Sequence, residues 1–194
     1  MKKGIALCCT VFILLSSGYA QSNRVGVYVT PQYSFFKQKS DPNNVVKGKG
    51  FLFSTGAYYE TNWGVCGVSF GLGYSQLNTT FSEITQKKRF GSLPIGVAYE
   101  FDIADNFFLG IQATIGINYL VSEKQVVDGI EVPAELGKRL YFSYGGGLSF
   151  TYLFSDAIGL SIMPTFLGIS AFDPAAQLYL GVGGQIRFFY AFGY

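Results

Sequence analysis

The sequence predicts an all-β fold, an eight-stranded antiparallel up-and-down barrel, and three observations lead to this prediction. Large apolar residues alternate with Gly, Ser, Thr, Gln and Asn along eight segments, which is the two-residue period of a β-strand. Aromatic residues make up 18% of the chain and charged residues only 13%, against about 25% charged in soluble domains. No run of about 20 apolar residues follows the N-terminal segment. Since only helices and closed barrels span membranes, the sequence predicts a transmembrane β-barrel.

Residues 1–20 are predicted to be a secretory signal peptide, which leaves residues 21–194 as one barrel domain. Two lysines precede an apolar segment, residues 5–15, that is too short to span a bilayer. Gly18 and Ala20 supply the small residues of a cleavage site. A signal peptide predicts export from the cytoplasm.

Charge, cysteine and histidine content exclude several classes of function. The chain carries 14 Lys and Arg and 12 Asp and Glu. Without Lys2 and Lys3 the charges balance, so no nucleic-acid partner is expected. Cys66 is the one cysteine beyond the predicted signal peptide, so it cannot form a disulfide within the barrel domain. There is no histidine, which removes the usual general base and metal ligand. We therefore expect no catalytic, cofactor-binding or metal site, and a protein that is not an enzyme.

Each predicted strand has one face of large apolar residues and one of small or polar residues. The last strand shows this best, with Gln185 and Arg187 opposite its apolar series. The second strand is the least regular, because Leu52 and Tyr58 fall on the side opposite Phe51. An eight-stranded barrel has an interior just wide enough for side chains, so the small set is expected inside and the large set against lipid. A soluble, lipocalin-like barrel is the alternative fold. The predicted strands cover residues 24–36, 50–60, 64–76, 89–101, 106–120, 138–154, 158–170 and 177–194.

The predicted connections alternate between short and long. Outer-membrane barrels have short periplasmic turns and long external loops, so both termini are predicted to be periplasmic. The first long loop, residues 37–49, has turn chemistry without periodicity and is expected to be mobile. In the third, Asp128-Gly129 between alternating β-branched residues predicts a hairpin that continues the flanking strands. The short connections are residues 60–64, 102–106 and 155–157, and the others are residues 37–49, 77–88, 121–137 and 171–176.

Basic residues gather at the predicted external ends of the strands. They are expected to meet the anionic phosphates of lipopolysaccharide, although ordinary loop solvation would give the same pattern. These outer-rim residues are Lys87, Lys88, Arg89, Lys138 and Arg139.

Two charged residues are predicted to face the lumen. Arg187 has the inward parity of the last strand, Glu100 has the inward parity of the fourth, and Arg24 can face inward too. A buried charge needs a partner. Our hypothesis is that Arg187 pairs with a lumenal acidic group, with Glu100 the candidate, as part of a plug or as a selectivity pair.

The chain resembles the small outer-membrane β-barrel families, including OmpA-like and OmpX-like barrels. Its C-terminal pattern is similar to the signal read by the barrel-assembly machinery, here Ile186, Phe188, Tyr190, Phe192 and Tyr194. The stretch FGSLPIGVAYEF, residues 90–101, resembles a segment of the PorT-like barrel domain. The resemblance implies residence in the outer membrane of a Gram-negative cell.

Three functions follow as expectations. The first is a structural or interaction barrel with a largely filled lumen, whose external loops bind an extracellular or envelope protein partner. The second is a narrow pore for small solutes. The third, which the PorT-like resemblance allows, is an accessory component of an envelope or secretion machine.

Overall fold

A computed structural model of the 194-residue chain describes residues 21–41, 44–81, 83–127, 129–134, 139–171 and 177–193. The predicted signal peptide, Asp128, Lys138 and Tyr194 lie outside these residues. The described part contains no helix long and apolar enough to cross a membrane, a finding that concerns helical spans only.

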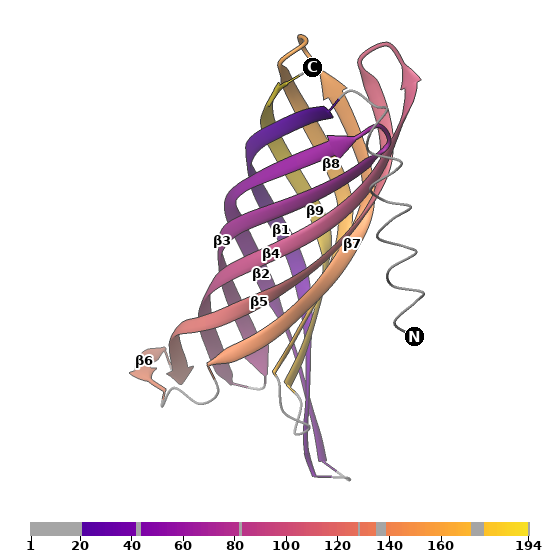
Figure 1. The fold of residues 1–194 in the computed structure, drawn as a ribbon. Coiled ribbons are helices and arrows are strands. Elements are labelled where there is room, and N and C mark those ends of the chain that lie inside the picture. Colours follow the sequence, from indigo (N-terminus) through magenta and orange to yellow (C-terminus); the bar gives the residue numbers. More distant parts are fainter. Residues whose placement is uncertain are drawn as a thin grey trace, which may run out of the picture.

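Eight antiparallel strands close into a barrel, which confirms the predicted fold (Figure 1). Each strand pairs with its neighbours in the chain, and β9 pairs with β1 to close the ring. The short strand β6 pairs with the end of β5 and forms a hairpin beyond the wall. The strands are β1 (Gln21–Asp41), β2 (Asn44–Trp63), β3 (Cys66–Phe81), β4 (Ile84–Ala104), β5 (Phe107–Val127), β6 (Ile130–Pro133), β7 (Leu140–Leu153), β8 (Ile158–Ala171) and β9 (Gln177–Phe192).

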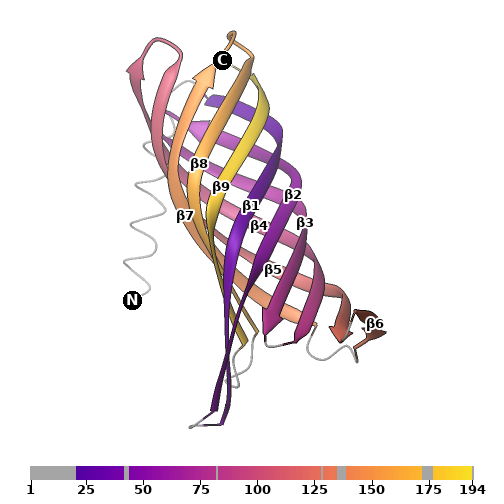
Figure 2. The ribbon, with the colours of Figure 1, turned by 180° about the vertical axis from the view of Figure 1, so that it is seen from behind.

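The two ends of the barrel differ (Figures 1 and 2). The turn end, at the top of Figure 1, holds the start of β1, the end of β9 and the short connections. Gly64 and Asn106 supply left-handed residues there, with φ of 60° and 65°, a conformation that tight turns require. The hairpin end holds the β1–β2, β3–β4 and β5–β6 connections, and β1 and β2 reach furthest from the wall.

The predicted long connections are largely strand, which corrects the sequence analysis. In the first of them β1 and β2 stay paired as far as Asp41 and Asn44. In the second, β3 and β4 stay paired as far as Phe81 and Ile84. Main-chain hydrogen bonds across a ladder do not need alternating side chains, so the absence of a pattern did not predict the absence of a strand.

The predicted Asp128-Gly129 hairpin is confirmed. Val127 pairs with Ile130 across the turn, and Gly129 has a φ of 79°, which favours glycine.

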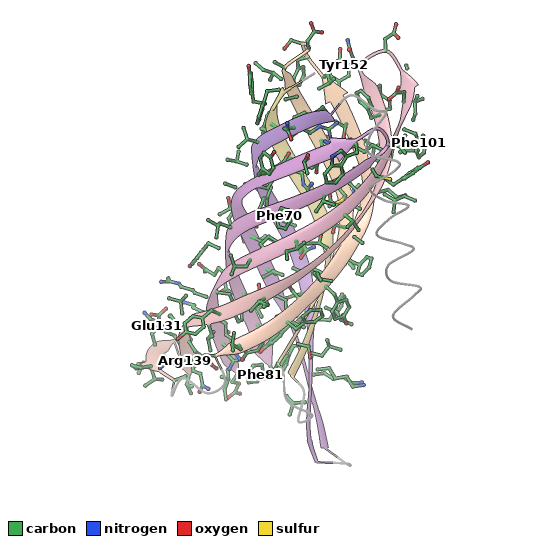
Figure 3. The ribbon with its side chains drawn as sticks, viewed as in Figure 1. Phe70, Phe81, Phe101, Glu131, Arg139 and Tyr152 are labelled. Atoms are coloured by element: carbon green, nitrogen blue, oxygen red, sulfur yellow. The ribbon has the colours of Figure 1, made fainter. Side chains whose placement is uncertain are left out.

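The two faces of the wall are as predicted. Large apolar side chains project outward all round the barrel (Figure 3), among them Phe70 on β3, Ile115 on β5 and Phe188 on β9. Of the proposed assembly signal, Ile186, Phe188, Tyr190 and Phe192 lie outward and exposed. Leu52 and Tyr58, the irregular residues of the second predicted strand, are buried inside the barrel.

Candidate functional site

The lumen is the candidate site, and its side chains form three layers. Along β1 the inward residues run from Arg24 near the turn end, through Thr30 and Gln32, to Phe36 near the hairpin end. The inward side chains of the other strands follow the same order from the turn end to the hairpin end: charged or small, then polar, then apolar. We call the layers the charge layer, the chamber and the lid.

The lid lies in the lumen toward the hairpin end. It consists of eight apolar or aromatic residues that are 0–3% exposed and form one cluster. Each of the eight barrel strands contributes one of them. The aromatic rings pack closely, with centroids 4.8 Å apart for Phe36 and Tyr179 and 5.1 Å apart for Phe90 and Tyr141. The lid residues are Phe36, Leu52, Leu77, Phe90, Leu120, Tyr141, Ile169 and Tyr179.

Lys88 lies within this lid, so its predicted place on the outer rim is wrong. Its side chain is 2% exposed, and its Nζ lies 3.6 Å from Glu123 Oε1. The ammonium donates a hydrogen bond of 3.1 Å to the Tyr141 hydroxyl and lies over the Tyr141 and Tyr179 rings. Because β4 extends past the predicted strand boundary, Lys88 shares the inward parity of Phe90.

A β-bulge brings Glu123 to Lys88. Arg89 pairs with Ser122 while Phe90 pairs with Leu120, so β5 carries one extra residue, Val121, at this point. The extra residue reverses the parity of β5, and Glu123 turns into the lumen. There it accepts a hydrogen bond from the Gln86 amide. A strict two-residue period would have directed Ser122 inward instead.

Lys87, Arg89 and Arg139, the other predicted rim residues that the structure describes, lie near the hairpin end and outside the lumen. Arg89 is exposed, and Arg139 is exposed and donates to the Tyr119 hydroxyl at 3.0 Å. Lys87 pairs with Glu131 of β6 at 2.6 Å (Figure 3 labels Glu131 and Arg139).

Glu131 lies beyond the barrel wall and forms ion pairs with two lysines. Hydrogen bonds from Lys87 and Lys124 lower the pKa of this carboxyl from 4.5 to about 2. The second ion pair, to Lys124 Nζ, measures 3.0 Å. These contacts tie the β5–β6 hairpin to β4.

The charge layer holds two arginines and two glutamates. Arg24 Nη1 lies 3.1 Å from Glu60 Oε1 and 2.6 Å from Glu100 Oε2. Arg187 Nη1 lies 3.7 Å from Glu60 Oε2. Arg187 and Glu100 therefore both face the lumen as expected, but the pairing differs from the hypothesis. Arg187 pairs with Glu60, and Glu100 pairs with Arg24.

Aromatic rings and hydroxyls complete this layer. The Arg24 guanidinium lies over the Phe189 ring, 4.8 Å from its centroid. That of Arg187 lies over the Tyr58 ring at 4.9 Å. Thr151 donates to Glu100 at 3.0 Å. The charges of the layer balance, and its arginine and glutamate side chains are mostly buried.

The chamber lies between the charge layer and the lid. It is a cavity of about 90 Å³ whose lining combines apolar and polar side chains, and the polar ones include Thr30, Gln32, Ser54, Ser75, Asn118 and Gln185. Some of these groups bond one another, since the hydroxyls of Ser54 and Ser75 are 2.8 Å apart and Gln185 donates to Thr30 at 3.0 Å. No group of three His, Cys, Asp or Glu that could hold a metal ion occurs among the described residues.

Comparison with known proteins identifies the family. Residues 5–185 match the family described as outer membrane protein beta-barrel domain. Among solved structures, Neisserial surface protein A is 14% identical with a TM-score of 0.47, and the match covers 83% of this chain and 95% of that chain. The attachment invasion locus protein Ail of Yersinia pestis is 16% identical with a TM-score of 0.42, over 90% and 99% of the two chains.

OprG of Pseudomonas aeruginosa is 12% identical with a TM-score of 0.44, over 91% of this chain and 97% of that chain. No curated protein matches this sequence. The family match spans most of the chain, from residue 5 to residue 185. The chain therefore belongs to the outer membrane protein beta-barrel domain family, whose place is the outer membrane of Gram-negative cells.

Proposed function

We propose that this chain is a non-enzymatic barrel with a closed lumen, which acts through its hairpin end as a structural or interaction protein. The lid carries this proposal. A ring of eight almost fully buried side chains, one from each strand, crosses the lumen. A narrow pore would need these side chains to part. The lack of histidine in the whole chain supports a role without acid–base catalysis.

We propose that the hairpin end is external and that both termini are periplasmic. The support is the difference between the ends. Short turns centred on Gly64 and Asn106 close one end, while paired strands extend the other. Outer-membrane barrels place short turns in the periplasm. The outward apolar residues near the end of β9, from Ile186 to Phe192, suit recognition by the barrel-assembly machinery during insertion.

Lipopolysaccharide is the proposed lipid partner of the hairpin end. Lys37 and Lys47 are exposed and lie directly opposite each other on β1 and β2. Like charges in this position repel, and an anionic phosphate beside both would relieve the repulsion. Exposed Arg89 and Arg139 add two guanidinium groups, which suit phosphate.

Planar-bilayer recording of the refolded protein tests the closed lumen. We expect inserted protein to give no discrete conductance, and the same protein with Phe90→Ala and Tyr141→Ala to give openings, because both changes remove rings from the lid. Reproducible openings in the unaltered protein would overturn the proposal and favour a pore.

Binding to vesicles tests the lipid partner. We expect the barrel to bind lipopolysaccharide with a lower affinity after Lys37→Gln and Lys47→Gln. The matched control is Lys87→Gln with Lys124→Gln, which removes two lysines that already form ion pairs with Glu131. Equal losses in both double variants would contradict the assignment to β1 and β2.

A further inference from the structure

The chamber contains polar groups that the protein leaves without partners. Gln32 is 1% exposed and Asn118 is 3% exposed, and both line the chamber. The Nε2 and Oε1 atoms of Gln32 and the Nδ2 atom of Asn118 make no hydrogen bond with any described residue. Buried amides are nearly always hydrogen-bonded, because leaving them unpaired is costly. Their partner is therefore expected inside the chamber.

The two amides belong to opposite walls of the barrel. Gln32 is on β1 and Asn118 is on β5. The closed ring runs β1, β2, β3, β4, β5, β7, β8, β9, so β5 is four strands from β1 in either direction. A molecule in the chamber can thus meet one amide on each side.

Glycine on the neighbouring strand leaves space for the Gln32 amide. A Cβ built on Gly181 of the neighbouring strand β9 would lie only 2.8 Å from Gln32 Oε1, and one built on Gly183 would lie 2.9 Å from its Cγ. A side chain at position 181 would push the amide from its place, whereas one at position 183 would first meet the backbone of Pro31 and Gln32. Gly181 thus keeps an unpaired amide where it lines the chamber.

The charge of the lining determines the kind of ligand. Arg187 is the charged residue among those that line the chamber, and it already pairs with Glu60 and donates to Gln185 at 2.5 Å. The remaining polar groups of the lining are amides and hydroxyls, and they lie among apolar side chains such as Met163 and Leu167. Such a lining matches a neutral molecule that both donates and accepts hydrogen bonds.

We propose that the chamber is a binding site for one small uncharged molecule with hydrogen-bond donors and acceptors, of the carboxamide or short-polyol class. The volume of about 90 Å³ limits the ligand to a few heavy atoms, since one ordered water needs about 10–15 Å³ by the same measure. The lid and the charge layer hold the bound molecule from its two sides. This inference goes beyond the proposed function and does not depend on it.

Acetamide and acetate are the matched probes, because they have nearly the same shape and differ in charge. The full chain is refolded in detergent with either probe present, so that the probe needs no route past the lid. Nuclear magnetic resonance then follows the side-chain amide signals of Gln32 and Asn118, assigned with Gln32→Leu and Asn118→Leu. The amide of Gln76 on β3, which donates to Asn78, serves as the internal control.

With acetamide, we expect saturable shifts of both chamber amides and magnetisation transfer from the acetamide methyl group to them. The Gln76 signal should not move, and acetate should bind at least tenfold more weakly. Ser54→Leu, which fills part of the chamber, should abolish the shifts. Asn118→Leu should weaken binding tenfold or more, and it provides the test if Ser54→Leu does not fold.

Two results would overturn the proposal. One is contact of the chamber amides with water only, at every acetamide concentration. The other is an equal response to acetamide and acetate. Neither result affects the closed lumen, which the bilayer recording tests separately.

Discussion

Glu123→Gln should destabilise the barrel because it removes a carboxylate that pairs with the Lys88 ammonium inside the lid. The two groups lie 3.6 Å apart and are 2% and 9% exposed. At that separation two unit charges attract by about 5 kcal/mol at an effective dielectric constant of about 20. Removal of one partner from a buried pair typically costs roughly 3–5 kcal/mol. We expect a loss of free energy of unfolding in this range.

The double variant Lys88→Met, Glu123→Leu should recover the loss. It replaces both charges by apolar groups of similar size, and such replacements range from neutral to stabilising by about 1–4 kcal/mol. The lid around them is already apolar, so the new side chains have matching neighbours.

Urea unfolding in lipid vesicles measures both variants, with the fluorescence of Trp63, the one tryptophan of the chain, as the signal. The free energy of unfolding changes by about 1–3 kcal/mol per molar urea in small proteins. The single variant should therefore unfold at a midpoint at least about 1 M lower. A single variant as stable as the unaltered protein would refute the reasoning, and so would a double variant as unstable as the single one.

Three further outcomes are expected. Phe90→Ala removes a fully buried ring and should cost about 3–5 kcal/mol; an unchanged urea midpoint would show that the lid is loosely packed. Glu60→Gln should destabilise the barrel more than Glu100→Gln, because Glu60 meets both arginines and Glu100 meets one; equal urea midpoints would contradict this. In the folded protein the pKa of Glu131 lies below its ordinary value of 4.5. Its ion pairs with Lys87 and Lys124 should therefore stabilise the β5–β6 hairpin fully above about pH 4.5, and this stabilisation should be lost as the pH falls toward 2. A carboxyl resonance of Glu131 that titrates near 4.5 would disprove that contact.

Alternation alone predicted which face of each strand meets the lumen. It placed Arg187 and Glu100 inside, and both are there. The same rule applied to Lys88 would have placed it beside Phe90, since the two share a parity on β4. The error lay in the strand boundary, because a lysine pair followed by arginine indicates a solvated rim.

Two features could not be predicted from the pattern. The bulge at Val121 reverses the parity of β5, and nothing in the local residue types marks it. The choice of Glu60 as the partner of Arg187 depends on how far each strand is displaced along the barrel axis. That displacement is a property of the closed ring.

The layered lumen also constrains how the strands can align during assembly. A slip of one residue would turn every apolar side chain of a strand from lipid to lumen. A slip of two residues leaves every side chain on the same side of the wall. The outer surface is apolar along most of its length, so it hardly distinguishes the shifted alignment from the native one. Inside, the same slip moves each side chain by about 7 Å, which carries a lid residue such as Leu120 toward the chamber or a charged residue such as Glu60 away from its arginines. The packing of the interior therefore distinguishes strand alignments that the lipid-facing surface does not distinguish.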